Sequence, residues 1–162
     1  MRLDEAKNYT SGGALVKALQ AESRERTLGW LTDAATLLAA QTLLGEIRAA
    51  IPGEEARLTA LEEDQANAAA ALRDAEERAA EALTARTLAG ASDRETYSAA
   101  IGDLQRAEYA RDELAGALRA AEGRVSEAQR DLARLRDHEA ALQAVTYTGP
   151  RAIEILLRGE TC

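Results

Sequence analysis

The second half of the chain carries an uninterrupted heptad repeat over residues 97–142, and this repeat limits the possible folds more than any other feature. In a repeat written abcdefg, positions a and d recur at steps of three and four residues. Position a holds Tyr97, Leu104, Arg111, Leu118, Val125, Leu132 and Glu139, and position d holds Ala100, Ala107, Leu114, Ala121, Ala128, Leu135 and Leu142. This spacing predicts a long helix with one stripe, here called the seam, that packs lengthwise against another helix.

A second seam precedes the first and has the same period. It consists of Leu58, Leu61, Gln65, Ala68, Leu72, Ala75, Ala79, Ala82, Arg86 and Ala89. Gly90 is a typical helix stop, and Ser92 with Glu95 fits the capping box of a new helix. A short turn at 90–92 between two seams predicts an antiparallel hairpin, in a register that sets Leu114 opposite Leu72.

Composition supports a helical fold. Of the 162 residues, 38 are alanine and 22 are leucine, whereas phenylalanine is absent and aromatic residues make up 3%. Alanine and leucine favour helices, and sheets need the β-branched and aromatic residues that are scarce here. We therefore expect one all-α chain: a long antiparallel coiled-coil helical hairpin (54–144), an irregular N-terminal arm (1–13), an N-terminal helical base (14–51) and a C-terminal docking tail (145–162).

The base is the richest part of the chain in large apolar residues. Thr10 or Ser11 is placed to cap a helix that begins near Ala14, and the chain has a possible break at 26–29. Apolar residues in 28–51 cover more than one side of the helix, which indicates burial on several sides. Pro52-Gly53 then interrupts the pattern, as either a kink or a tight turn.

The tail has a different character from the seams. Residues 145–148 have strand propensity, and Gly149-Pro150 is a turn signal. Residues 152–157 fit a second strand, with Ile153, Ile155 and Leu157 alternating, and they fit a short helix equally well. In either form, the tail is expected to dock on another surface.

The charge and the cysteine content of the chain limit the kinds of binding partner and the cellular location that we expect. The net charge of −8 argues against binding to nucleic acid, which requires clustered Lys and Arg. A single cysteine excludes an intrachain disulfide, and the opening residues lack the apolar run of a signal peptide. The uncharged stretch 34–45 is shorter than the roughly 20 residues of a bilayer span. We expect a soluble protein, either cytoplasmic or assembled in a virion-like particle, without membrane contact.

No residue pattern indicates catalysis, a metal site or a cofactor. His138 is the only histidine and is expected on the solvent side of its helix, and Cys162 is expected to be an inert terminal thiol. The seam that begins at Leu58 can be extended backward through Ile51, Ile47 and Leu44, and Glu54 and Glu139 are then the only carboxylates on a seam. We expect both to be partly exposed. Arg111 is expected to lay its aliphatic stem along the seam with its charge pointing outward. Acid–arginine pairs at i, i+3 are expected on outer faces: Asp103/Arg106, Glu127/Arg130 and Asp131/Arg134.

These features predict a non-enzymatic structural or assembly subunit that is oligomeric, alone or with other proteins. A phage virion, connector or injection machine would be a suitable setting, by analogy of fold. The alternative is a coiled-coil chaperone or adaptor that binds a client at the hairpin tip. The residues expected at protein interfaces are Leu28, Trp30, Leu31, Leu37, Leu38, Leu83, Leu88, Ile101, Tyr147, Ile153, Ile155 and Leu157.

Overall fold

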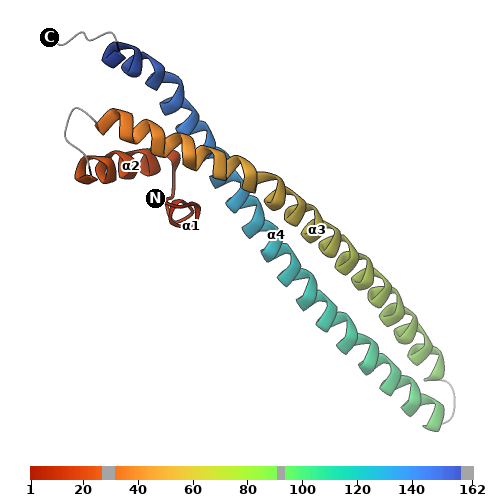
Figure 1. Cartoon of the computed structure of the whole chain (residues 1–162). Coiled ribbons are helices and arrows are strands. Elements are labelled where there is room, and N and C mark those ends of the chain that lie inside the picture. Colours follow the sequence, from red (N-terminus) through yellow and green to blue (C-terminus); the bar gives the residue numbers. More distant parts are fainter. Residues whose placement is uncertain (27–31, 91–93, 158–162) are drawn as a thin grey trace. The chain divides into compact units, whose positions relative to one another are not determined.

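The computed structural model describes residues 1–26, 32–90 and 94–157, with the side chains of 1–26, 34–90 and 94–146. These residues form four helices and no strand (Figure 1). The helices are α1 (Leu3–Ala6), α2 (Gly12–Arg26), α3 (Thr32–Ala89) and α4 (Arg94–Leu157). The prediction of a helical fold is confirmed for the described part of the chain.

The two long helices, α3 and α4, pack against each other as expected for a hairpin (Figure 1). The backbone N–H of Gly90 donates to the carbonyl of Arg86 at 3.1 Å and closes the last turn of α3. The helix then stops, and α4 begins at Arg94, so the link falls where the sequence places the turn. Ser92, the expected cap, lies outside the described residues.

The chain divides into two units. Unit 1 comprises Met1–Ala56 and Gln129–Cys162, and unit 2 comprises Arg57–Ala128. Unit 1 contains α1, α2, the first part of α3 and the last part of α4. Unit 2 contains the remaining parts of the two long helices.

Unit 2 follows the predicted seam closely. Every seam residue in this unit is buried or half-buried except Arg86 and Tyr97. The buried positions are dominated by alanine, with Leu104 and Val125 as the large side chains. Small residues let two helices approach closely, but each contributes little apolar area.

Unit 1 has the main apolar core. Its fully or nearly fully buried members come from all four helices and are Ala6, Leu15, Leu19, Ala40, Leu43, Leu44, Ile47 and Leu142. Met1, Tyr9, Ile51 and Val145 are among the side chains that pack against this cluster. All four helices therefore contribute to unit 1, and α1 and α2 supply part of its core.

Three local expectations need correction or resolution. The segment expected to be irregular contains α1, and α2 begins at Gly12 rather than near Ala14. α3 continues through Pro52, so no turn forms there. A proline inside a helix costs about 3 kcal/mol, and packing on both sides of it, by Ile51 and Leu58, offsets that cost.

The strand alternative for the C-terminal tail is wrong, because α4 continues to Leu157. The hydroxyl of Thr146 donates to the carbonyl of Gln143 at 2.9 Å, which accommodates this β-branched residue within the helix. The helix thus continues through residues 145–148 despite their strand propensity.

Candidate interaction surfaces

Within unit 1, one face of α4 receives the segment that joins α1 to α2. This face, here called the N-terminal seat, consists of Arg134, Asp137, His138 and Ala141. The guanidinium Nη1 of Arg134 donates to the carbonyl of Lys7 at 3.2 Å. The backbone N–H of Gly12 donates to Oδ2 of Asp137 at 2.6 Å. The spacing of three, four and seven residues aligns these groups on one side of the helix.

Gly12 makes the closest backbone approach in the seat. A Cβ atom on this residue would lie 2.6 Å from the carbonyl oxygen of Asp137 and would overlap the Cβ of Ala141. Glycine is needed here for space. Ser11 caps α2, because its Oγ accepts the N–H of Ala14 at 3.3 Å. This agrees with the expectation from the sequence.

His138 is fully buried in the seat, so the expectation of a solvent-exposed histidine is wrong. Its Nε2 lies 3.1 Å from the carbonyl of Tyr9, and because a carbonyl can only accept, Nε2 carries the proton. Its Nδ1 is buried with no hydrogen-bond partner. Burial lowers the pKa of the imidazole from its ordinary 6.5, the Tyr9 carbonyl and Asp137 oppose this shift, and Arg134 reinforces it.

The apolar residues predicted at interfaces differ in how exposed they are, and several lie outside the described part of the chain. Leu37 is buried, at 4% exposure, and belongs to the interior, whereas Leu38 is 66% exposed. In unit 2, Leu83 and Leu88 are 50% and 71% exposed, and Ile101 is half-buried. Leu28, Trp30 and Leu31 lie outside the described residues. Tyr147, Ile153, Ile155 and Leu157 belong to α4, but their side chains are outside the described part.

A shallow hollow of about 260 Å³ lies on one face of unit 2. It is lined by Glu76, Ala79, Ala80, Leu83, Leu104, Glu108 and Arg111. Tyr97, Ile101 and Leu104 follow each other at four- and three-residue steps on α4, so the apolar side of the hollow continues toward the tip. Ala79 and Ala80 lie one turn before the half-exposed Leu83 on the same helix, and their small side chains leave room for an inserted side chain.

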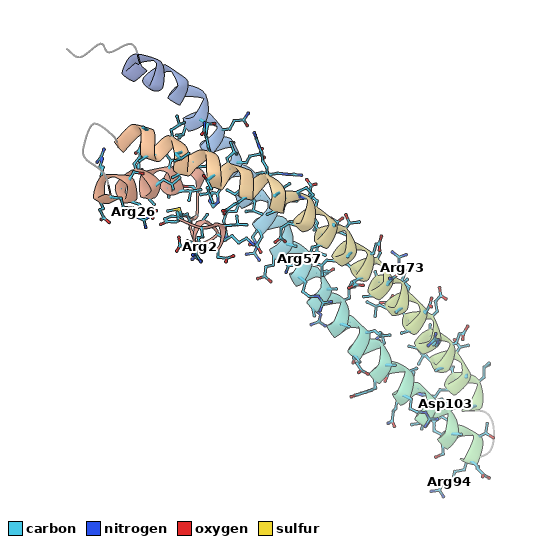
Figure 2. The ribbon with its side chains drawn as sticks, viewed as in Figure 1. Arg2, Arg26, Arg57, Arg73, Arg94 and Asp103 are labelled. Carbon is cyan, nitrogen blue, oxygen red and sulfur yellow. The ribbon has the colours of Figure 1, made fainter. Side chains whose placement is uncertain are left out.

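Charged side chains lie mainly on the outer faces of the two long helices, as Figure 2 shows for Arg73 on α3 and Asp103 on α4. The predicted pair of Asp103 and Arg106 forms, and Arg134 lies 3.8 Å from Asp131. The guanidinium of Arg111 pairs with the neighbouring Asp112 at 2.7 Å, which raises its pKa.

The two seam carboxylates are both partly buried and paired. Glu139 binds Arg48 at 2.8 Å, and Glu54 lies 3.7 Å from the ammonium of Lys7. Their side chains are 28% and 20% exposed. Within the described ranges, no group of three or more His, Cys, Asp or Glu side chains is placed to hold a metal ion. Cys162 lies outside those ranges.

One helix is long and apolar enough to cross a membrane, by length and composition alone. An 18-residue window of α3 has a mean hydropathy of 1.2, and 33% of this window is buried inside the protein. A core helix of a water-soluble protein meets the same criterion. In unit 1, α3 contributes Ala40, Leu43 and Ile47 of this stretch to the core.

Comparison of the chain with protein-family models, curated proteins and solved structures found no match.

Proposed function

We propose that this chain is a non-enzymatic structural or assembly subunit, in which the α3–α4 hairpin of unit 2 acts as a coiled-coil docking arm. The observation that carries the proposal is that unit 2 buries mostly small side chains and leaves several large apolar side chains exposed. Its buried side chains are mostly alanines, whereas Leu83 and Leu88 are half or more exposed.

Apolar area supplies the energetic argument. Burial contributes about 25 cal/mol per Å², so a seam of alanines stabilises a helix pair only weakly. An inserted leucine or aromatic side chain contributes about 1.5–3 kcal/mol when it becomes fully buried. A partner helix that covers Leu83 and Ile101 would therefore add more apolar burial than several of the alanine contacts within the arm.

Charge favours a different protein over a second copy as the partner of the arm. Residues 57–128 carry 9 arginines, no lysine and 15 acidic residues, a net charge of −6. Two such arms side by side would repel each other, while a helix with basic flanks would be attracted. We propose a large assembly of the virion, connector or injection-machine type as the setting, by analogy of fold.

The test uses two charge substitutions, Leu83→Glu in the hollow and Ile101→Glu on the face of α4 that continues from it toward the tip. Both should abolish co-purification of a stoichiometric partner and reduce the mass measured by light scattering, without loss of helical circular dichroism. Tyr109→Glu is the matched control, because Tyr109 is 73% exposed and does not line the hollow. A monomer at every concentration that co-purifies with no stable partner would refute the assembly role.

The hollow also favours the alternative of an adaptor or chaperone that holds a client at the arm. Assembly predicts a fixed stoichiometry and slow exchange of the partner. A client-binding protein instead predicts a monomer that binds unfolded polypeptides transiently, and Leu83→Glu would remove that binding. The mass of the native complex separates the two roles.

A further inference from the structure

We propose that His138 makes the N-terminal seat of unit 1 a pH-sensitive contact: protonation of its imidazole loosens the segment of residues 7–12 from α4. The inference concerns a different unit from the docking arm and does not depend on the proposed function. It rests on the geometry of the ring, which has one satisfied nitrogen, one unsatisfied nitrogen and no exposed surface.

The hydrogen-bond geometry fits only the neutral ring. Nε2–H donates to the carbonyl of Tyr9, and the bare Nδ1 faces the interior without a donor. Protonation adds an N–H at Nδ1 and a full positive charge, for which the closed seat provides no acceptor. Opening of the segment would hydrate both, so acid favours the open form.

The charged groups around the ring do not cancel this effect. On α4, Asp137 favours the imidazolium and Arg134 opposes it. Asp137 already accepts the N–H of Gly12 at 2.6 Å. Arg134 is held in place by the carbonyl of Lys7 at 3.2 Å.

Several charges that the other elements of this unit bring to α4 are already paired. From the joining segment, the ammonium of Lys7 lies 3.7 Å from Glu54 of α3. Between α3 and α4, Arg48 pairs with Glu139 and Arg136 pairs with Glu55. The first turn of α2 carries no acidic residue that could bind a new N–H.

The expected motion is local. Leu15 and Leu19 of α2 are buried in the apolar core, and protonation of His138 leaves that burial unchanged. We therefore expect residues 7–12 to open more often while the rest of α2 stays docked. Because the folded ring resists protonation, opening becomes easier as pH falls below 6.5, by up to about tenfold per pH unit until the ring titrates in the closed form.

The measurement is amide hydrogen exchange between pH 5 and 7.5, corrected for the intrinsic pH dependence of exchange. The Gly12 amide reports the seat, and the Leu19 amide, inside α2, is the internal reference. A carbon–proton spectrum follows the ring titration directly, because the chain has one histidine. The comparison variant is His138→Gln, whose amide can donate to Tyr9 but cannot titrate; His138→Leu is used if it does not fold.

The proposal expects protection at Gly12 to fall with acid below pH 6.5 in the wild-type chain and to level off where the ring itself titrates, while Leu19 stays protected. The variant should show no such fall. Equal loss of Gly12 protection in wild type and variant would assign the effect to a group other than His138 and overturn the proposal. An imidazole that titrates below 6.5 with unchanged Gly12 protection would also overturn it.

Discussion

Adding one methyl group at Gly12 should destabilise unit 1, whereas the same change at the neighbouring Gly13 should not. A Cβ at Gly12 meets the Asp137 carbonyl oxygen at 2.6 Å, and it also meets the Cβ of Ala141. Both atoms belong to α4 and cannot move without shifting that helix. A Cβ at Gly13 meets no heavy atom within 4 Å.

The magnitude follows from three contributions. Overpacking against a rigid neighbour costs about 1–3 kcal/mol. The same displacement weakens the bond from the Gly12 N–H to the Asp137 carboxylate, which is worth about 1.5–3 kcal/mol when fully lost. Alanine recovers at most about 1 kcal/mol of helix propensity. We expect Gly12→Ala to lower the free energy of unfolding of unit 1 by about 2–4 kcal/mol, and Gly13→Ala to raise it by about 0.5–1 kcal/mol.

Urea unfolding followed by far-ultraviolet circular dichroism measures the difference between the two variants, with both glycines in the same helix as matched sites. Exchange of the Leu19 amide assigns the change to α2, because Leu19 lies in the core of unit 1. A Gly12→Ala protein as stable as the wild type, or as the Gly13→Ala variant, would show that α2 does not approach α4 as closely as the structure indicates.

Substitutions at three further positions, two in unit 1 and one in unit 2, are tested by the same unfolding assay. Leu142→Ala should cost about 2–5 kcal/mol, because Leu142 is fully buried among the core leucines; a cost below about 1 kcal/mol would contradict that packing. Asp137→Ala should cost about 1–3 kcal/mol by leaving the Gly12 N–H without its acceptor, and Asp137→Asn, which keeps an oxygen, should cost less. Arg106→Ala should change stability by less than about 0.5 kcal/mol, since its pair with Asp103 is exposed, and a larger loss would reveal a contact of Arg106 beyond that pair.

The helical hairpin could be predicted from the sequence because its seam residues recur at a regular heptad spacing. Leu104, Ala121 and Val125 were placed on the seam by spacing alone, and all three are buried. Pro52 and residues 145–148 were misleading for the opposite reason: each is a local signal, and helix packing over many turns outweighs it. Neither the propensity differences of a few tenths of a kcal/mol at residues 145–148 nor the cost of about 3 kcal/mol at Pro52 ends a helix that is held on a long seam.

The N-terminal seat could not be predicted because most of its residues are polar. The segment between α1 and α2 that covers it has no regular spacing of apolar residues. In a two-helix hairpin, the g position of His138 faces solvent, and the heptad frame assigns it there. In unit 1 the joining segment between α1 and α2 covers this position and makes it the most deeply buried polar side chain of the described residues. The only available signal was the spacing of Arg134, His138 and Ala141 on one helix face, which a search for apolar residues does not detect.

The same helix pair therefore has two different environments along its length. In unit 2, the flanks of the seam remain partly open, and Leu83 and Ile101 are accessible to a partner. In unit 1, the flank of α4 is closed by the N-terminal segment, and the closure depends on three polar contacts and one glycine. Apolar contacts are insensitive to pH, whereas a buried imidazole is not. We therefore expect mild acid to loosen the N-terminal segment of unit 1 first, while apolar contacts that a partner makes with Leu83 and Ile101 of unit 2 persist.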